Sequence, residues 1–244
     1  MPDIHEQEGF SEAQHALLFA WISRAVIETV GQQKGQEAIC KAVLRYGTQR
    51  GKRMALRARA NGDPLNMLNY MAYGEWKASP GKMEQAMVEK SPHARIHIPK
   101  CPWYTTWDEN GLLPYGRYYC LVIDEALASG FNPELQIDVN GTLSNGAGQC
   151  EFIYHDANLT PTNESILAYK KAVVPGESAV MPWEYHVGHL YTTLKTVLTA
   201  ELGAEGQKAV EQGLAEFKAR FGEQASQNVV AFQNTDFDAL PVGS

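Results

Sequence analysis

The sequence predicts a single α+β domain in which helices pack around a small antiparallel sheet or hairpin. Three observations support this fold class. Apolar residues recur at helical spacing near both ends of the chain, residues 94–155 contain short alternating segments bounded by glycine turns, and no repeat or break in composition divides the 244 residues. A hydrophobic fraction of 44% is ample for one proper core.

Charge and hydropathy narrow the classes of partner. A net charge of −7 disfavours a protein that neutralises nucleic-acid or lipid phosphates. The chain has no apolar run of about 18 residues, and its first ten residues lack the features of a secretory signal. We therefore expect a cytoplasmic protein, and its four cysteines, none in a C-x-x-C pair, should be reduced thiols. The expected partner is a small-molecule substrate, with a homo-oligomer as an open alternative.

Residues 10–80 are predicted to be helical. A capping-box pattern, Ser11 with Gln14, starts an amphipathic helix that Gly31 ends. A second helix from about Gln36 runs into a basic stretch, residues 45–59, that carries no acidic residue. Most of its cations are interpreted as a solvated face, but Arg50 or Arg53 could point inward and bind a carboxylate. A third helical pattern, residues 65–76, ends before a turn at residues 79–81.

A helix–hairpin core is predicted over residues 94–155, starting with a strand at residues 94–98. Cys101 precedes Pro102, which favours the first position of a short helix that Gly111 ends. As the helix cap beside Lys100, Cys101 is expected to have a lowered pKa, which makes it the best thiolate candidate in the chain.

Two further thiols lie in the same core. Cys120 and Asp124 share one face of a helix predicted over residues 116–129, where they could serve acid and base steps. Strands at residues 136–139 and 150–154 are predicted to pair antiparallel, with Cys150, Phe152 and Tyr154 on one face. If that face covers the helix of Cys120, the three thiols converge.

The rest of the chain supplies two candidate histidines. Residues 156–181 are predicted to be a long loop of the lid or binding type, and helices follow within residues 182–222. His186 and His189 lie three positions apart on the first of these helices, so both could face an active site and one could act as general base. The tail, residues 223–244, is expected to be loosely ordered from Asn234.

The central segment CPWYTTWDENGLLPYGRYYCLVIDEALASGFNP, followed by GTLSNGAGQCEF, resembles the L-2-amino-thiazoline-4-carboxylic acid hydrolase family. The similarity rests on the ordered set CP, YC-x-x-x-D, GF-N-P and C-x-F, and WEYHVGHLY fits the family's C-terminal helix. It covers most of residues 45–200. The resemblance implies hydrolysis of a carbon–nitrogen bond in a small heterocycle, opening a thiazoline ring to an N-carbamoyl amino acid.

On this hypothesis either Cys101 attacks the ring or a histidine directs water, with Asp124 orienting or protonating. Asn132 would hold developing charge, Arg117 or Arg53 would bind a substrate carboxylate, and Trp107 and Tyr119 would contact the substrate.

A more distant similarity is to vinyl-4-reductase-like sensor domains, which implies a non-catalytic binding module with structural zinc. Cys101, Cys120 and Cys150 would be its ligands, but a further cysteine of those domains is replaced by Thr142. The wide spacing of the cysteines is a weak metal signal, so no cofactor is expected and zinc is the alternative.

Overall fold

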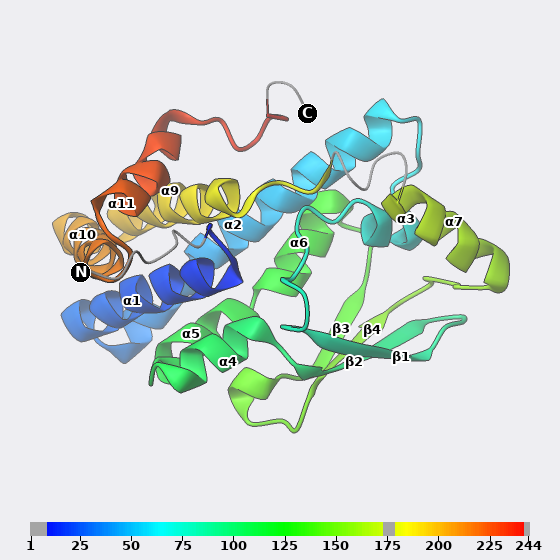
Figure 1. Ribbon diagram of the computed structural model, residues 1–244, viewed down its shortest axis with the longest axis horizontal. Helices are drawn as coiled ribbons and strands as arrows, with labels where there is room; N and C mark the ends of the chain where they lie inside the picture. The colour runs from blue at the N-terminus through cyan, green and yellow to red at the C-terminus, as the bar shows by residue number, and fades with distance from the viewer. Residues whose placement is uncertain (1–8, 173–178, 242–244) are drawn as a thin grey trace, which may run out of the picture.

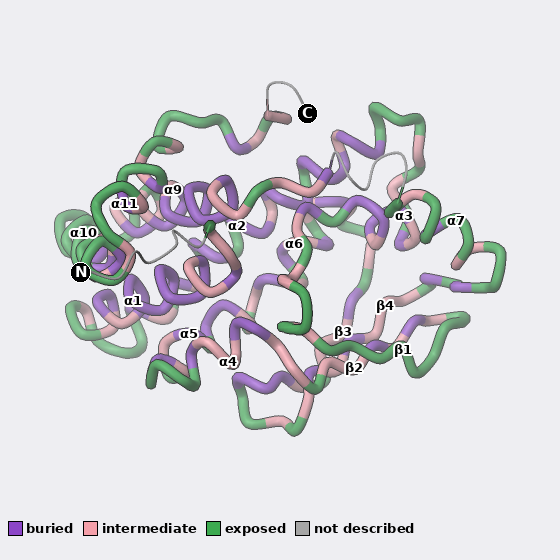
Figure 2. The backbone as a smooth tube through the Cα atoms, in the orientation of Figure 1, coloured by how far each residue is buried: buried purple, intermediate pink, exposed green. Residues whose placement is uncertain are grey.

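Two apolar cores shape the chain, one among helices and one behind a sheet. The computed structural model describes residues 9–172 and 179–241. In Figure 1 the long helices α1, α2 and α9 lie on one side and the sheet on the other, with α6 between them. Figure 2 shows that buried residues concentrate along α1, α2 and α9, whereas β1 is exposed. The arrangement confirms the predicted α+β class.

The helices differ in length from six residues to 29. They are α1 (Glu12–Val30), α2 (Gln32–Ala60), α3 (Met67–Ala72), α4 (Pro102–Glu109), α5 (Leu113–Cys120), α6 (Ile123–Phe131), α7 (Pro161–Ala172), α9 (Trp183–Leu202), α10 (Ala204–Phe221) and α11 (Glu223–Val230), with short 3₁₀ turns η1 (Leu143–Asn145) and η2 (Ala231–Asn234). The capping box of α1 forms as predicted, since the Gln14 side chain accepts the Ser11 N–H at 2.9 Å and Gly31 ends the helix. Among the described residues, no helix is long and apolar enough to cross a membrane.

The sheet has four antiparallel strands in the order β1-β2-β4-β3. They are β1 (Glu84–Glu89), β2 (Ala94–Lys100), β3 (Ile137–Gly141) and β4 (Cys150–Tyr154). Strand β2 and the β3–β4 pair confirm the sequence-based strands. Ile98 lies opposite Cys150 in the register, so the inner face of β4 continues across β2.

Several boundaries differ from the prediction. The helix expected over residues 116–129 is two helices, α5 and α6, with a break at Leu121–Val122. The helix expected over residues 65–76 is only α3, and the exposed edge strand β1 was not predicted. Within the expected 156–181 loop, 12 residues form the helix α7, while residues 173–178 lie outside the described residues.

The expectation of a loosely ordered tail is wrong as far as residue 241, and residues 242–244 lie outside the described part. Phe237 is buried and stacks on His189, with 4.1 Å between the ring centroids. The Asp238 carboxylate accepts hydrogen bonds from Gln49 and Lys52 on α2, at 3.2 and 3.3 Å. The tail therefore packs on α2 and α9, because its aromatic ring and its acid find partners there.

Candidate functional site

A cavity of about 240 Å³, here called the central cavity, lies where the two apolar cores meet. Trp103 and Tyr119 on its wall belong to the helical core, and Tyr70 and Phe152 belong to the core behind the sheet. Gln85 of the exposed strand β1 also borders it, so the cavity opens to solvent beside that strand. A concave, mainly aromatic space with few polar groups is the usual form of a small-molecule site.

Three free thiols line the central cavity. Cys101 is the cap residue before α4, with Pro102 at the first turn as predicted, Cys120 ends α5, and Cys150 begins β4. The Cys150 sulfur accepts the Leu143 N–H at 3.3 Å. The helix–hairpin unit thus brings the three predicted thiols to one space.

The expectation of a lowered pKa at Cys101 is wrong. Burial raises the pKa of its thiol to about 11, although the backbone N–H groups of Tyr104 and Trp103 oppose the rise. Burial also raises the pKa of Cys120, against a hydrogen bond from Ser144, and the pKa of Cys150. All three thiols are protonated at neutral pH, because the apolar wall disfavours a thiolate more than the start of α4 favours it.

The donor set does not fit the zinc alternative. Within residues 9–172 and 179–241, no three His, Cys, Asp or Glu side chains are arranged to hold a metal ion, the cavity thiols included. Thr142, at the position of the extra cysteine in the sensor domains, borders the cavity, and its Oγ1 lies 3.1 Å from the Ser144 Oγ. These hydroxyls satisfy each other, which suits a polar wall.

Asp124 is the carboxylate of the cavity wall. It lies in the first turn of α6 and is half-buried, facing the cavity. Burial raises its pKa from 3.8 to about 6, although the positive charge of Arg50 opposes the rise. Within the described residues its carboxylate makes no hydrogen bond or ion pair with another side chain. Such a group changes protonation near neutral pH and is free to act on a ligand.

Three tyrosines surround this carboxylate on the cavity wall: Tyr70, Tyr119 and Tyr154. Burial raises the pKa of each phenol, and the negative charge of Asp124 raises it further. They therefore remain neutral hydrogen-bond donors. Trp76 adds an aromatic wall and packs edge-to-face on Trp103, with 4.9 Å between ring centroids.

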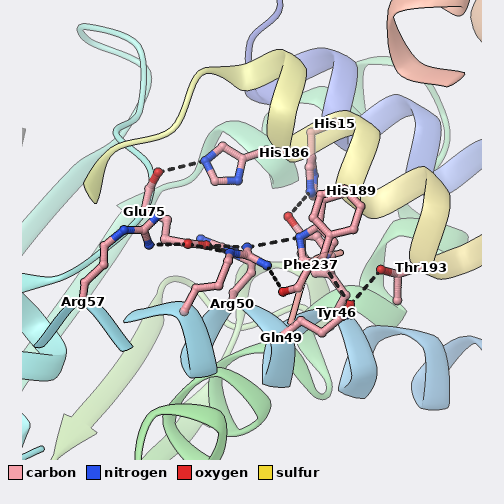
Figure 3. Close-up of polar contacts among 11 residues, drawn as sticks. His15, Tyr46, Gln49, Arg50, Arg57, Glu75, His186, His189, Thr193 and Phe237 are labelled. Atoms are coloured by element: carbon pink, nitrogen blue, oxygen red, sulfur yellow. Dashed lines mark hydrogen bonds and ion pairs between the residues drawn. The ribbon is translucent and has the colours of Figure 1, made fainter. Parts of the chain in front are cut away.

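The basic stretch of α2 is exposed at Arg45, Lys52 and Arg59, as expected for a solvated face, and buried at Arg50, Arg53 and Arg57. The inward direction expected for Arg50 or Arg53 is confirmed, and the carboxylate that Arg53 binds is that of Glu75. These three buried arginines each pair with Glu75, in the segment between α3 and β1. Figure 3 shows Arg50 and Arg57 beside Glu75. Only Arg50 of the three borders the central cavity. Its inward position agrees with the sequence-based expectation and continues the stripe of Ala42 and Tyr46 on α2.

The two histidines of α9 belong to this buried network, away from the cavity wall. The His186 Nε2 donates to the Glu75 carbonyl at 2.8 Å, and the His189 ring bonds Gln49 at 3.0 Å (Figure 3). Burial lowers the pKa of His186 to about 3 and that of His189 well below its ordinary value, and nearby arginines lower both further. Their geometry suits a neutral structural pair.

The other predicted substrate contacts also lie apart from the cavity, except Tyr119. The Trp107 indole donates to the Ala16 carbonyl at 2.9 Å inside the helical core. Arg117 is exposed, Asn132 donates to the Leu65 carbonyl at 2.8 Å, and Arg53 is paired with Glu75. Trp107, Asn132 and Arg53 are thus satisfied by local protein partners.

Comparison with known proteins gives one match. A family model described as L-2-amino-thiazoline-4-carboxylic acid hydrolase matches residues 11–154. The match covers more than half of the 244 residues and includes Arg50, Asp124 and the three cavity thiols, but it ends before α9. No curated protein and no solved structure matches the chain.

Proposed function

Because the chain belongs to the L-2-amino-thiazoline-4-carboxylic acid hydrolase family, we propose that its central cavity opens a cyclic amidine of the 2-amino-thiazoline type by hydrolysis. One observation carries the proposal. The unpaired carboxylate of Asp124, whose pKa is about 6, faces a small aromatic cavity inside the segment that matches the family.

The reaction consumes one water. Water adds across the carbon–nitrogen double bond of the amidine, so the ring carbon gains a C–O bond and the ring nitrogen takes up a proton. Collapse of the tetrahedral intermediate then breaks the bond from this carbon to the ring sulfur, which leaves with a proton as a thiol. The product is an N-carbamoyl amino acid, and breaking the ring carbon–nitrogen bond would give the S-carbamoyl isomer. For the N-carbamoyl product the ring bond that breaks is thus carbon–sulfur, so the proposal differs here from the expected cleavage of a carbon–nitrogen bond.

Asp124 suits the proton transfers of both steps. As a carboxylate it accepts a proton from the attacking water and passes it to the ring nitrogen, and during collapse it accepts the remaining hydroxyl proton and passes it to the departing sulfur. A pKa near 6 lies close to neutral pH, which favours transfer in both directions. The neutral hydroxyls of Tyr70 and Tyr154, which line the same cavity, would donate to charge that develops on the added oxygen.

A thiol mechanism is the alternative. Cys101 could attack the ring carbon directly, but its pKa of about 11 leaves little thiolate at neutral pH. The unpaired Asp124 therefore supports attack by water over attack by sulfur.

The test is to incubate the purified protein with 2-amino-thiazoline-4-carboxylate and follow the appearance of a free thiol, with the product mass as a second readout. We expect turnover, and a loss of about 100-fold or more in Asp124→Asn. Glu125→Gln is the matched control, since this exposed neighbour lies on the same helix and does not line the cavity. Binding without turnover would favour the sensor alternative, and a fully active Asp124→Asn protein would overturn the role of Asp124.

A further inference from the structure

We infer that Arg50 determines specificity by binding a carboxylate on the substrate ring, an inference that rests on the proposed function. The guanidinium is 3% exposed and borders the central cavity. Its Nε and Nη2 atoms are buried and have no hydrogen-bond partner among the described residues. Unpaired buried donors on a permanent cation are costly, so they mark a place where an anionic ligand is expected.

The position of Glu75 explains why these two Arg50 donors make no hydrogen bond, although Arg50 and Glu75 form an ion pair. The Glu75 carboxylate is fully buried and accepts two hydrogen bonds from Arg53, at 2.9 and 2.7 Å, and one from Arg57 at 2.7 Å. The Arg50 Nε lies 3.6 Å from the nearest Glu75 oxygen, beyond hydrogen-bond distance. One carboxylate is therefore shared by three guanidinium groups, and Arg50, at the cavity, makes the longest contact with it. Figure 3 shows Arg50 and Arg57 beside Glu75.

Apart from the Glu75 network and Asp124 on the cavity wall, the groups around Arg50 neither add to nor offset its charge. His15, His186 and His189 have lowered pKa values because they are buried, so they are neutral at pH 7. The neighbouring Tyr46 offers its ring, with the Arg50 guanidinium carbon 5.5 Å from the centroid. A stacked guanidinium is held in place and remains able to bind an anion.

The cavity wall thus carries two opposite charges on two facing helices. Arg50 comes from α2 and Asp124 from α6, which pack against each other. A ring with a carboxylate at one end and an amidine at the other matches this pair, with the carboxylate at Arg50 and the reacting carbon near Asp124. Binding at Arg50 would then orient the ring for attack.

The test compares two ligands that differ only in the carboxylate, 2-amino-thiazoline-4-carboxylate and 2-aminothiazoline. Binding is measured by calorimetry in the Asp124→Asn background, so that turnover does not interfere. We expect Arg50→Met to weaken binding of the carboxylated ring by about 10- to 100-fold and to leave binding of the bare ring unchanged. Arg50→Lys should restore part of the loss, because lysine keeps the charge without the planar fork.

Arg57→Met is the matched control, because it removes the same charge from the same network but does not line the cavity. If Arg57→Met weakens binding of the carboxylated ring as much as Arg50→Met does, the loss comes from the general positive charge of the network. That result would overturn the inference. Equal losses for both ligands in Arg50→Met would overturn it as well.

Failure of the proposed function would look different. Suppose that the wild-type protein opens neither ring, while Arg50→Met still weakens binding of the carboxylated ligand alone. The hydrolase proposal would then be refuted and the assignment of Arg50 would stand. Should fluorescence or thermal unfolding show that Arg50→Met is not folded, Arg50→Lys alone decides. Its binding of the carboxylated ring must then weaken relative to the bare ring, and an unchanged ratio would overturn the inference.

Discussion

Gly51 on α2 lies directly against the carbonyl oxygen of Leu127 on α6, where an added Cβ would come within 2.1 Å of that oxygen. The contact is between backbones, so neither side can turn away. Gly51 is the neighbour of Arg50, and Leu127 lies one turn beyond Asp124 on α6. The absence of a side chain at position 51 therefore sets how closely the two charged groups of the central cavity approach.

Gly51→Ala is expected to destabilise the fold by about 1–3 kcal/mol, because α2 and α6 must separate to admit the methyl group. Urea unfolding measures the loss, and ring-opening activity should fall with it. Gly148→Ala is the control, since a Cβ there meets no atom within 4 Å. A Gly51→Ala protein as stable as the control would show that α2 and α6 separate at no cost in stability, and would contradict the prediction.

The ring-opening activity should decrease as the pH falls below about 6. If Asp124 must be ionised to accept a proton, kcat/KM rises with pH and levels off above its pKa of about 6. Rate measurements between pH 4.5 and 8.5 check this. A midpoint near 3.8, the ordinary value, would mean that the carboxyl is well solvated, and the same midpoint in Asp124→Asn would assign it to another group.

Asp124→Asn should stabilise the protein at pH 8 while it removes activity. Because the folded-state pKa is raised, the folded state binds the proton more tightly than the unfolded chain, and stability falls as pH rises from 3.8 through about 6. Removing the charge should recover on the order of 2 kcal/mol at pH 8, and less at pH 5. Urea unfolding at both pH values gives the comparison, and a destabilised variant at pH 8 would contradict it.

Single cysteine variants should keep most of the activity. With a pKa of about 11, roughly one Cys101 thiol in 10⁴ is ionised at pH 7. We expect Cys101→Ser, Cys120→Ser and Cys150→Ser to remain within about tenfold of wild type, whereas loss of a true nucleophile typically costs about 10⁴-fold or more. Slow alkylation by iodoacetamide at pH 7 is the matching chemical readout.

The buried histidines should make the protein sensitive to acid. The unfolded chain protonates His186 near its ordinary value of 6.5, whereas the folded state resists protonation until about pH 3. Stability is therefore lost as pH falls below 6.5, at up to about 1.4 kcal/mol per pH unit for each such histidine. His186→Gln, whose amide can still donate to the Glu75 carbonyl, should show a shallower slope between pH 6.5 and 4. An identical slope would exclude His186 as a source.

Local patterns were enough to predict much of the fold. The capping box at Ser11, the stop at Gly31, the proline after Cys101 and the alternation from Cys150 to Tyr154 each act within a few residues, and each was found where expected. Strand β1 was not predicted because all six of its residues are exposed, so no apolar alternation marks it. The break between α5 and α6 carries no proline or glycine that would have indicated it.

The candidate site divides in the same way. The sequence by itself determined that three thiols and Asp124 share one helix–hairpin unit, because all four are spaced within a continuous segment. Only the tertiary structure decided their protonation, since burial at the junction of two cores depends on segments far apart in the chain. It also decided that Arg53 is paired while Arg50 is left at the cavity. Both arginines lie on the inner side of α2, and the distance of each from the one carboxylate of Glu75 separates their roles.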